Sequence, residues 1–160
     1  MSRPDAGAMR EQLAGEGREA VVSHGTVVVE LAPEAVLATA QELKARHGFD
    51  LLLDVTAVDW PQREPRFDVV WHFYSTRHFL RVRVKTQVAA ADPVVDSLTG
   101  LYGSAGYMER ECHDMYGIRF RGNDDLRPIL LYEGFEGHPL RKDYPKQKEQ
   151  PLVPYRDVKP

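Results

Sequence analysis

Four titratable side chains lie close together in the stretch YMERECHDMYG, residues 107–117. Glu109, Glu111, His113 and Asp114 carry carboxylates and an imidazole, the groups that bind divalent metal ions or transfer protons. Glu109 and His113 are four residues apart, so a helix would place them one turn apart, at a spacing that two metal ligands can use. One hypothesis is therefore a small metal-dependent enzyme that uses Glu109, His113 and Asp114.

The same stretch lacks the other parts of a catalytic site. It has no second histidine in helical register, no HExxH motif and no strong nucleophile motif. Cys112 precedes His113, but adjacent helical residues point to different sides, so an inert thiol is favoured over a reactive pair. The glycines of GLYGSAG, residues 100–106, lack the trailing lysine of a phosphate-binding loop. We therefore expect a structural charge cluster, with no catalytic, cofactor-binding or metal-binding residue in this chain.

A structural cluster of acids needs positive partners. Glu111 and Asp114 are three residues apart on a predicted helix, where two carboxylates repel each other. Arg110 can reach Asp114 only in the weaker of the two orientations. The candidate counter-charges further along the chain are Arg127, Arg141 and Lys142. The last two belong to GHPLRKDYP, residues 137–145, which supplies cations either to this helix or to a neighbouring protein.

Composition excludes several other functions. The 160 residues are 42% hydrophobic and 28% charged, which is ordinary for a globular domain. Cys112 is the only cysteine, so this chain cannot hold an iron–sulfur cluster through several thiolates. No apolar run approaches the roughly 20 residues that span a bilayer, and the first residues lack the apolar core of a secretion signal. We expect a cytosolic protein without direct membrane insertion.

A predicted strand has one cationic face, formed by Arg81, Arg83 and Lys85. Nucleic-acid binding is one interpretation, but a net charge of −3 gives the chain no general attraction to nucleic acid. A solvated strand face, or a sheet edge protected by charge, is favoured. We therefore expect no nucleic-acid partner.

Composition and periodicity divide the chain into three zones. Residues 1–25 are small, charged and glycine-dotted, and form either a flexible amino-terminal arm or a short helix at Ala8–Ala14. Residues 26–131 have the alternating and helical patterns of an αβ domain. Residues 132–160 are charged and proline-rich and are expected to form an extended, irregular carboxyl-terminal arm.

The patterns predict an α+β fold, with helices packed on an antiparallel or mixed sheet in a ferredoxin-like-related αββαβββ arrangement. Residues 51–58 are apolar on both alternating faces, which predicts a central strand covered on both sides. Gly117 is expected to close a helix at 107–116 in the left-handed conformation. The other predicted elements are a strand at 26–31, a helix at 33–47, an antiparallel meander at 67–74 and 80–85, a helix at 93–102 and a short strand at 126–131.

Three sequence blocks in the last third of the chain carry a family resemblance. They are ERECHDMYGI at Glu109 to Ile118, DLRPIL at Asp125 to Leu130 and EGHPLRKDYP at Glu136 to Pro145. In this order they strongly resemble the C subunit of the respiratory NADH-quinone oxidoreductase, complex I, whose mitochondrial form is the thirty-kilodalton subunit. The residues expected to serve structure and partner docking are Glu109, Arg110, Glu111, Asp114, Gly117, Asp125, Leu126, Arg127, Gly137, Pro139, Leu140, Arg141, Lys142 and Asp143.

The resemblance implies a subunit without chemistry of its own in a proton-translocating NADH:quinone oxidoreductase. In this family the subunit lies in the peripheral arm on the cytoplasmic side of the membrane and packs mainly against the D subunit, which forms the quinone cavity with the B subunit. FMN, iron–sulfur clusters, NADH and quinone are bound by other subunits, so no cofactor is expected here. The related alternatives are an equivalent subunit of a membrane-bound hydrogenase or of a complex with another electron donor.

The resemblance also suggests how docking works. The αβ domain is expected to act as a rigid block, and the charged blocks to fix the carboxyl-terminal arm and its docking surface on the D subunit. Breaking a buried ion pair there leaves an unpaired charge, so Arg141→Ala should reduce assembly more than it unfolds the isolated subunit. The tail from Lys146 to Pro160 is too polar and proline-rich to pack on itself. Its expected anchors to a partner are Leu152, Val153 and Tyr155.

Overall fold

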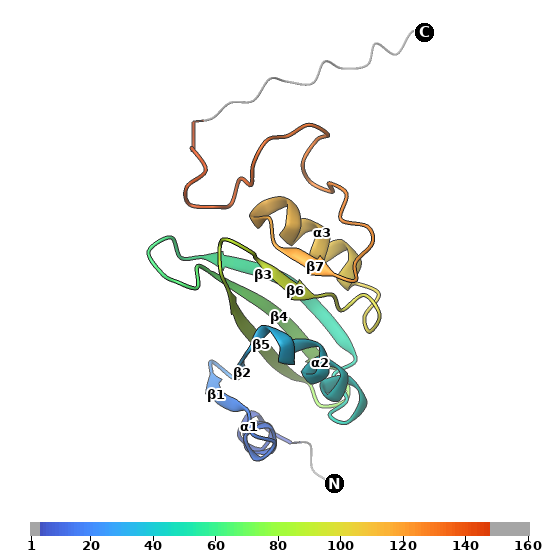
Figure 1. The fold of residues 1–160 in the computed structure, drawn as a ribbon. Coiled ribbons are helices and arrows are strands. Elements are labelled where there is room, and N and C mark those ends of the chain that lie inside the picture. Colours follow the sequence, from blue (N-terminus) through green and yellow to red (C-terminus); the bar gives the residue numbers. More distant parts are fainter. Residues whose placement is uncertain (1–3, 148–160) are drawn as a thin grey trace, which may run out of the picture.

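The structure, a computed structural model, describes residues 4–147 and shows helices packed on a five-stranded sheet (Figure 1). The elements in chain order are α1 (Ala6–Gly15), β1 (Glu19–Ser23), β2 (Thr26–Leu31), the 3-10 turn η1 (Pro33–Ala35), α2 (Val36–Ala45), β3 (Leu51–Asp59), β4 (Phe67–Ser75), β5 (Leu80–Val88), β6 (Val94–Asp96), α3 (Ala105–Tyr116) and β7 (Arg119–Arg121). The α+β class is confirmed, and the order of helices and strands from α1 to β5 is the predicted αββαβββ.

The five-stranded sheet has the strand order β1-β2-β5-β4-β3. β4 and β5 form the predicted antiparallel meander, in which Trp71 is opposite Val84 and Phe67 is opposite Val88. β2 runs parallel to β5, and the other neighbouring pairs are antiparallel. The central strand of the sheet is therefore β5.

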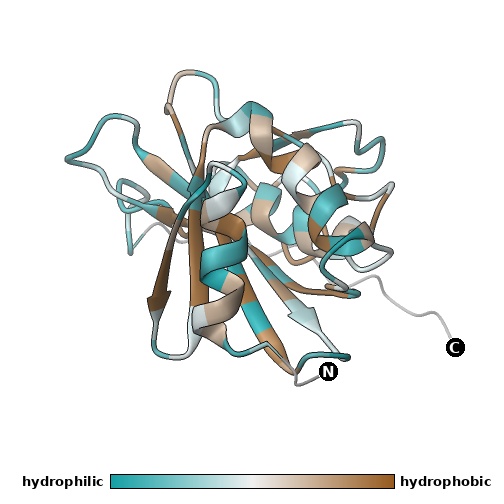
Figure 2. Cartoon of the chain, turned by 90° about the horizontal axis from the view of Figure 1, so that it is seen from below, coloured by the Kyte–Doolittle hydropathy of each residue, from teal (hydrophilic) through white to brown (hydrophobic). Residues whose placement is uncertain are grey.

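One face of the sheet carries the hydrophobic core. Phe67, Trp71 and Phe73 alternate along β4 and are fully buried on this face. All three helices contribute to the same core cluster, as Met9 of α1 and Cys112 of α3 illustrate. Figure 2 shows strands that are brown over much of their length, next to helices that carry both hydrophobic and hydrophilic residues. Within residues 4–147, no helix has both the length and the apolar character that a bilayer crossing requires.

The amino-terminal residues contain a helix and a strand. Asp5 caps α1 by accepting a hydrogen bond from the Ala8 amide at 2.8 Å, and Leu13 is fully buried in the core. β1, for which no residue range was predicted, pairs with β2 through a tight turn whose central residues, His24 and Gly25, have φ angles of 50° and 75°. Positive φ angles at both central residues suit a two-residue hairpin, so the histidine–glycine pair was the missed signal.

The predicted central strand at 51–58 is an edge strand, so that prediction is wrong. β3 pairs only with β4, and its register shifts between Leu52 and Asp54. Leu52, Val55 and Ala57 are buried in the core, whereas Leu51 and Val58 remain 43% and 38% exposed. Apolar residues on both faces indicated cover on both sides, but the described chain covers only one.

Two further predicted elements are also wrong. Residues 93–102 contain β6, which pairs in parallel with β7, in place of a helix. Leu98 and Tyr102 are buried at helical spacing because the amides of Leu101 and Tyr102 both donate to the Leu98 carbonyl in a turn. Residues 126–131 form no strand, because three of their amides are bound by an aspartate of α3.

Candidate functional site

The candidate site is the junction between α3 and the segment that follows β7. This segment, residues 122–147, is called the arm, and it contains no helix or strand. The predicted helix at 107–116 is confirmed as α3, which ends with Gly117 in the left-handed conformation at φ 75°. The arm passes along α3 and returns to the end of the sheet near the β3–β4 loop (Figure 1).

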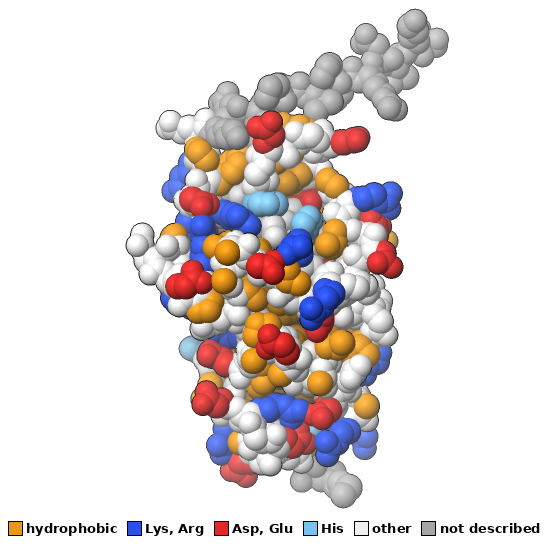
Figure 3. All heavy atoms as spheres, in the orientation of Figure 1, with side chains coloured by type: hydrophobic (Ala, Val, Ile, Leu, Met, Phe, Trp, Pro, Cys, Tyr) orange, Lys and Arg blue, Asp and Glu red, His pale blue; other side chains and the backbone are white. Residues whose placement is uncertain are grey.

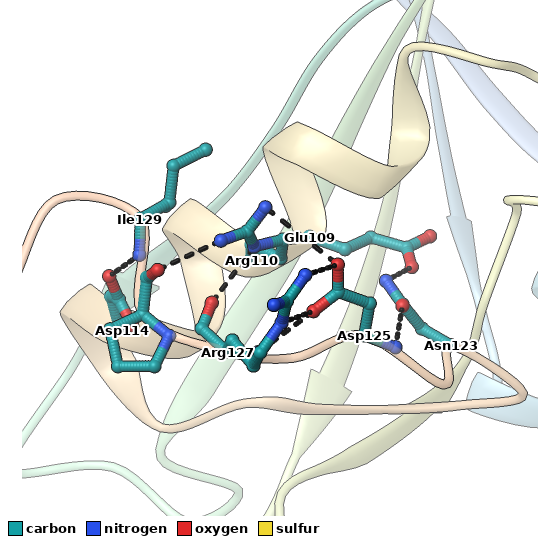
Figure 4. A network of polar contacts seen from close by, with 8 residues as sticks. Glu109, Arg110, Asp114, Asn123, Asp125, Arg127 and Ile129 are labelled. Carbon is teal, nitrogen blue, oxygen red and sulfur yellow. Dashed lines mark hydrogen bonds and ion pairs between the residues drawn. The ribbon is translucent and has the colours of Figure 1, made fainter. Parts of the chain in front are cut away.

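Glu109 is a fully buried acid that joins α3 to two other segments. Its Oε1 accepts the Leu98 amide at 2.7 Å, and its Oε2 accepts the Ser97 hydroxyl at 2.8 Å. Oε2 also accepts the Asn123 side-chain amide at 2.9 Å (Figure 4). Burial raises the pKa of Glu109, although these three hydrogen bonds oppose the shift. Glu109 therefore has a structural role at the start of the arm.

Asp114 holds the middle of the arm through backbone amides. Its side chain is buried, and Oδ2 accepts the amides of Ile129, Leu130 and Leu131 at 2.8, 3.0 and 3.3 Å. Three successive amides form a concave anion site that this carboxylate fills. Figure 4 shows the first of these bonds beside the other contacts of α3 with the arm.

Arg110 fixes the arm between these two acids. Its Nε and Nη2 donate to the carbonyls of Arg127 and Pro128, both at 2.8 Å. Arg127 itself is 80% exposed and forms a two-pronged pair with Asp125, with Nε–Oδ1 and Nη2–Oδ2 distances of 2.7 and 2.9 Å. That pair lowers the pKa of Asp125 to about 2. The Arg127 side chain therefore pairs with Asp125 of the arm and with no acid of α3.

The segment GHPLR closes the carboxyl-terminal end of α3. The carbonyls of Asp114, Met115 and Tyr116 accept hydrogen bonds from His138 Nδ1 at 2.9 Å, the Leu140 amide at 3.1 Å and Arg141 Nε at 2.6 Å. The last carbonyls of a helix have no partner within it, and a cation there also interacts favourably with the helix dipole. The arm thus caps three successive carbonyls of α3.

Gly117 makes this close approach possible. A Cβ atom at position 117 would lie 2.5 Å from His138 Nε2 and 2.6 Å from Arg141 Nη2, which is closer than such contacts occur. Its positive φ is also a conformation that residues with a side chain rarely adopt. Gly137 has the same constraint on a smaller scale, since a Cβ there would lie 3.0 Å from the Tyr144 ring.

The end of the arm is tied to the sheet by residues that the sequence analysis missed. Asp59, at the end of β3, has a fully buried side chain that pairs with Arg66 through two contacts of 2.6 and 2.7 Å. The same carboxylate accepts the Lys142 amide at 2.7 Å, and Arg66 also pairs with Asp143 at 2.8 Å. The hydrogen bond from Arg66 is the main cause that lowers the pKa of Asp59. The sequence signal for this ion pair was an acid, Asp59, directly after the predicted strand at 51–58 and an arginine, Arg66, directly before the next predicted strand.

The other predicted site residues are placed less centrally. Leu126 is partly buried against the core, and Pro139 is partly buried beside the exposed Leu140. Glu111 is exposed and forms no hydrogen bond or ion pair with any residue between positions 4 and 147. The expected tail anchors Leu152, Val153 and Tyr155 lie outside the described residues.

The prediction that cations of the arm supply counter-charges to the acids of α3 is therefore wrong. Arg127, Arg141 and Lys142 do not neutralise Glu109 or Asp114, which are satisfied mainly by amides and a hydroxyl. Backbone amides offer a positive dipole end without the cost of burying a second charge, which explains why no cation is needed. Arg127 pairs with Asp125, Arg141 caps a carbonyl of α3, and Lys142 contributes its backbone amide to Asp59.

The geometry offers little support for the metal-enzyme hypothesis. His113 Nδ1 is bonded to the Ile118 carbonyl at 2.8 Å, while the carboxylates of Glu109 and Asp114 are occupied by separate segments of the chain. Within residues 4–147 no group of three or more histidines, cysteines or acids is arranged to hold a metal ion. Cys112 is buried, and burial raises the pKa of its thiol. The arrangement is that of a segment anchored to α3 and to the end of the sheet.

Proteins of known sequence agree with the resemblance that the three sequence blocks carry. The C subunit of NADH-quinone oxidoreductase from Agrobacterium fabrum is 51% identical over 126 residues, which are 78% of this chain and 62% of that protein. The proteins of the same name from Rhizobium rhizogenes and Rhodobacter capsulatus are 48% and 42% identical, over 78% and 88% of this chain and 62% and 71% of theirs. The chain thus spans less than two thirds of the length of the first two relatives.

Solved structures show the same fold. A trypsin-resistant fragment of Nqo5 is 31% identical with a TM-score of 0.66, over 72% of this chain and 95% of the fragment. A chain of the membrane-bound sulfane sulfur reductase, an archaeal respiratory membrane complex, is 23% identical with a TM-score of 0.76, over 87% of this chain and 85% of that one. The second likeness concerns the fold alone.

The family comparison covers most of the described residues. Residues 29–150 match the family described as the respiratory-chain NADH dehydrogenase, 30 Kd subunit, and this range includes all three sequence blocks. The resemblance predicted from those blocks is confirmed. The chain belongs to the family of the 30 kDa subunit of respiratory-chain NADH dehydrogenase.

Proposed function

We propose that this chain is a non-catalytic, cofactor-free subunit of the peripheral arm of a proton-translocating NADH:quinone oxidoreductase. It docks on the D subunit beside the quinone-reduction module, on the cytoplasmic side of the membrane. The names of the relatives support the assignment to such a complex. The observation that carries the docking role is the arm, whose inner side is bonded to α3 and the sheet while its outer side exposes several apolar side chains.

The inner side is fixed at three places by polar groups of the αβ fold. Asp114 binds three amides of the arm, the end of α3 is capped by residues 138–141, and Asp59 with Arg66 binds the segment at 142–143. A segment without secondary structure normally loses conformational freedom when a partner binds it. Because these contacts already fix the arm, most of that cost is met during folding.

The outer side exposes apolar side chains at 129–132 and at 140. Leu130 and Leu140 are 61% and 48% exposed, and Tyr132 and Ile129 are 38% and 36% exposed. Figure 3 shows hydrophobic side chains between charged ones on the surface at this end of the molecule. Aromatic and aliphatic anchors surrounded by polar groups are the usual centre of a protein interface. A protein surface is therefore the expected partner of this side.

The proposal is tested by purification of the tagged chain from gently solubilised native membranes. The wild-type chain is expected to bring down the D subunit and the rest of the peripheral arm. A Leu130→Ser/Leu140→Ser variant should lose the D subunit while it keeps the thermal unfolding of the wild-type chain. Phe79→Asn is the control, because Phe79 is 58% exposed in the β4–β5 turn with φ 56°, which asparagine tolerates.

Each outcome of the purification is informative. Normal recovery of the D subunit with the double variant would exclude the outer side of the arm as the docking surface. Recovery of a hydrogenase subunit, or absence of a NADH-binding flavoprotein, would assign the chain to a related complex with another electron donor. Turnover by the purified chain alone would contradict the non-catalytic role.

A further inference from the structure

The second face of the sheet is open in the described chain. Side chains alternate along the strands, and every buried apolar residue except Val28 and Val70 belongs to the one core cluster that includes the helices. Val28 and Val70 lie on β2 and β4 between core-facing neighbours, so they point to the opposite face. This opposite face of β1 to β5 is called the open face, and no helix within residues 4–147 packs on it.

The cationic strand identified from the sequence lies in the middle of the open face. Arg81, Arg83 and Lys85 alternate with the core residues Val82 and Val84 along β5. β5 has β2 on one side and β4 on the other. Protection of a sheet edge by charge therefore does not explain these residues, because a central strand has no free edge.

Two of the three cations have no acidic partner. Lys85 pairs with Glu30 at 3.3 Å, but Arg81 and Arg83 form no ion pair within the described part of the chain. The Nε of Arg83 is also buried without a hydrogen-bond partner. A buried N–H group without a partner is costly, so the described chain does not fully satisfy this guanidinium.

The neighbours of these arginines on β4 do not neutralise them. His72 of β4 is directly opposite Arg83, and Tyr74 is opposite Arg81. Burial, followed by the nearby charge of Arg83, lowers the pKa of His72, while Asp54 opposes the shift. Asp54, opposite His72 on β3, is the only carboxylate in this row of paired residues. Of the other acids on this face, Glu30 is paired with Lys85 and Asp68 with Arg63, so neither neutralises Arg81 or Arg83.

Exposed apolar residues border the cationic centre. Leu51 and Val58 of β3 are 43% and 38% exposed on the open face, and Val21 of β1 is 60% exposed at the other margin. A cationic centre with apolar margins fits a segment that carries both carboxylates and aliphatic side chains. We propose that the open face docks an acidic segment of a partner polypeptide, whose carboxylates pair with Arg81 and Arg83 and whose apolar side chains cover Leu51 and Val58.

A protein segment fits this surface better than other polyanions do. Nucleic acid is held by many phosphate contacts in a broad basic surface, and an anionic membrane attracts clusters of several cations. The open face offers two unpaired arginines in a chain of net charge −3. Specific pairing with a few carboxylates is the remaining way to use such a small positive centre.

The first test uses the isolated full chain, labelled with nitrogen-15, and a short peptide in which glutamate alternates with valine. The peptide is expected to shift amide signals of β4 and β5 and to bind about tenfold less tightly to Arg81→Gln/Arg83→Gln. Arg46→Gln is the matched control, since Arg46 is an exposed cation after α2, on the other face. Its affinity should equal that of the wild-type chain, and Arg81→Lys/Arg83→Lys should retain most of the binding.

Several results would overturn the proposal. Equal binding of a peptide with glutamine in place of glutamate would remove the role of charge. Shifts of the same amides by phosphatidylglycerol vesicles or duplex DNA, with none by the acidic peptide, would assign the face to another class of ligand. This test does not involve the D subunit, so its result is independent of the docking role of the arm.

The second test uses the assembled complex. A photoreactive amino acid at position 83 should cross-link to one peptide of a neighbouring protein, and that peptide should contain aspartate or glutamate at the site of attachment. Cross-links only to lipid, only to this chain or to no polypeptide at all would contradict the proposal. The same reagent at position 46 shows the background expected for an exposed arginine elsewhere.

Discussion

Arg141 Nε donates to the Tyr116 carbonyl at 2.6 Å, so the end of α3 is closed by a residue 25 positions further along the chain. The guanidinium also lies 5.1 Å from the centre of the Phe67 ring, at the start of β4. One side chain therefore joins a helix end, the core of the sheet and the arm. The charged block therefore holds parts of the subunit itself together.

Gly117→Ala is expected to loosen the arm strongly. The added Cβ would collide with His138 and Arg141, and the left-handed backbone is unfavourable for alanine by about 1–2 kcal/mol. Gly134→Ala is the matched control, because Gly134 also has a positive φ, of 89°, but a Cβ added there would meet no atom within 4 Å. Chemical denaturation should show a larger loss of unfolding free energy for Gly117→Ala. Equal losses of unfolding free energy in the two variants would mean that His138 and Arg141 leave room for a side chain at position 117.

Arg141→Ala should reduce assembly more than stability. The variant loses one charge-assisted hydrogen bond and a cation–π contact, together about 2–3 kcal/mol, yet the core of the sheet remains intact. The expected result is a modest fall in melting temperature and a large fall in the fraction assembled with the D subunit, measured on native gels. Arg127→Ala is the control, since Arg127 pairs only with Asp125 through its side chain. Normal assembly of Arg141→Ala would contradict the prediction.

The local part of the fold could be predicted from the sequence. The alternation of side chains in 67–74 and 80–85 predicts two strands. Gly117 at the end of a helical pattern predicts a helix that ends in the left-handed conformation. The edge position of β3 could not be predicted, because its apolar outer face has the same pattern as a strand that is covered on both sides.

The candidate site was found by resemblance, but its chemistry depends on long-range contacts. The sequence does not show that Asp114 meets three amides at 129–131, or that Asp59 meets Lys142 across 83 positions. Charge pattern alone suggested ion pairs between the blocks. In the structure, backbone carbonyls are capped and backbone amides bind the acids. Nearly every residue has these backbone groups, so the residue types in a sequence do not show which of them will be used.

Acid should release the end of the arm from the sheet. The Arg66 hydrogen bond lowers the pKa of Asp59 below its ordinary value of 3.8, so this contact stabilises the fold above that pH and is lost as pH falls through the lowered pKa. The Lys142 amide signal, which reports the bond to Asp59, should therefore titrate below pH 3.8 in nuclear magnetic resonance spectra. Asp59→Asn should abolish that titration. Asp50→Asn, which removes an acid held by Thr76 far from the arm, should leave it unchanged.

Glu109 should give the opposite pH dependence. Burial raises its pKa above the ordinary 4.5, so the unfolded chain ionises first as pH rises. The stability that the protonated group contributes is complete below pH 4.5 and is lost as pH rises through the higher pKa of the folded state. Glu109→Gln cannot ionise, so its unfolding free energy relative to the wild-type chain should improve with rising pH above 4.5, as measured by denaturation at a series of pH values. Glu111→Gln, at an exposed position of the same helix, is the control for replacing a glutamate in α3. A constant difference between Glu109→Gln and the wild-type chain would mean that Glu109 keeps an ordinary pKa in the fold, and that its three hydrogen bonds compensate fully for burial.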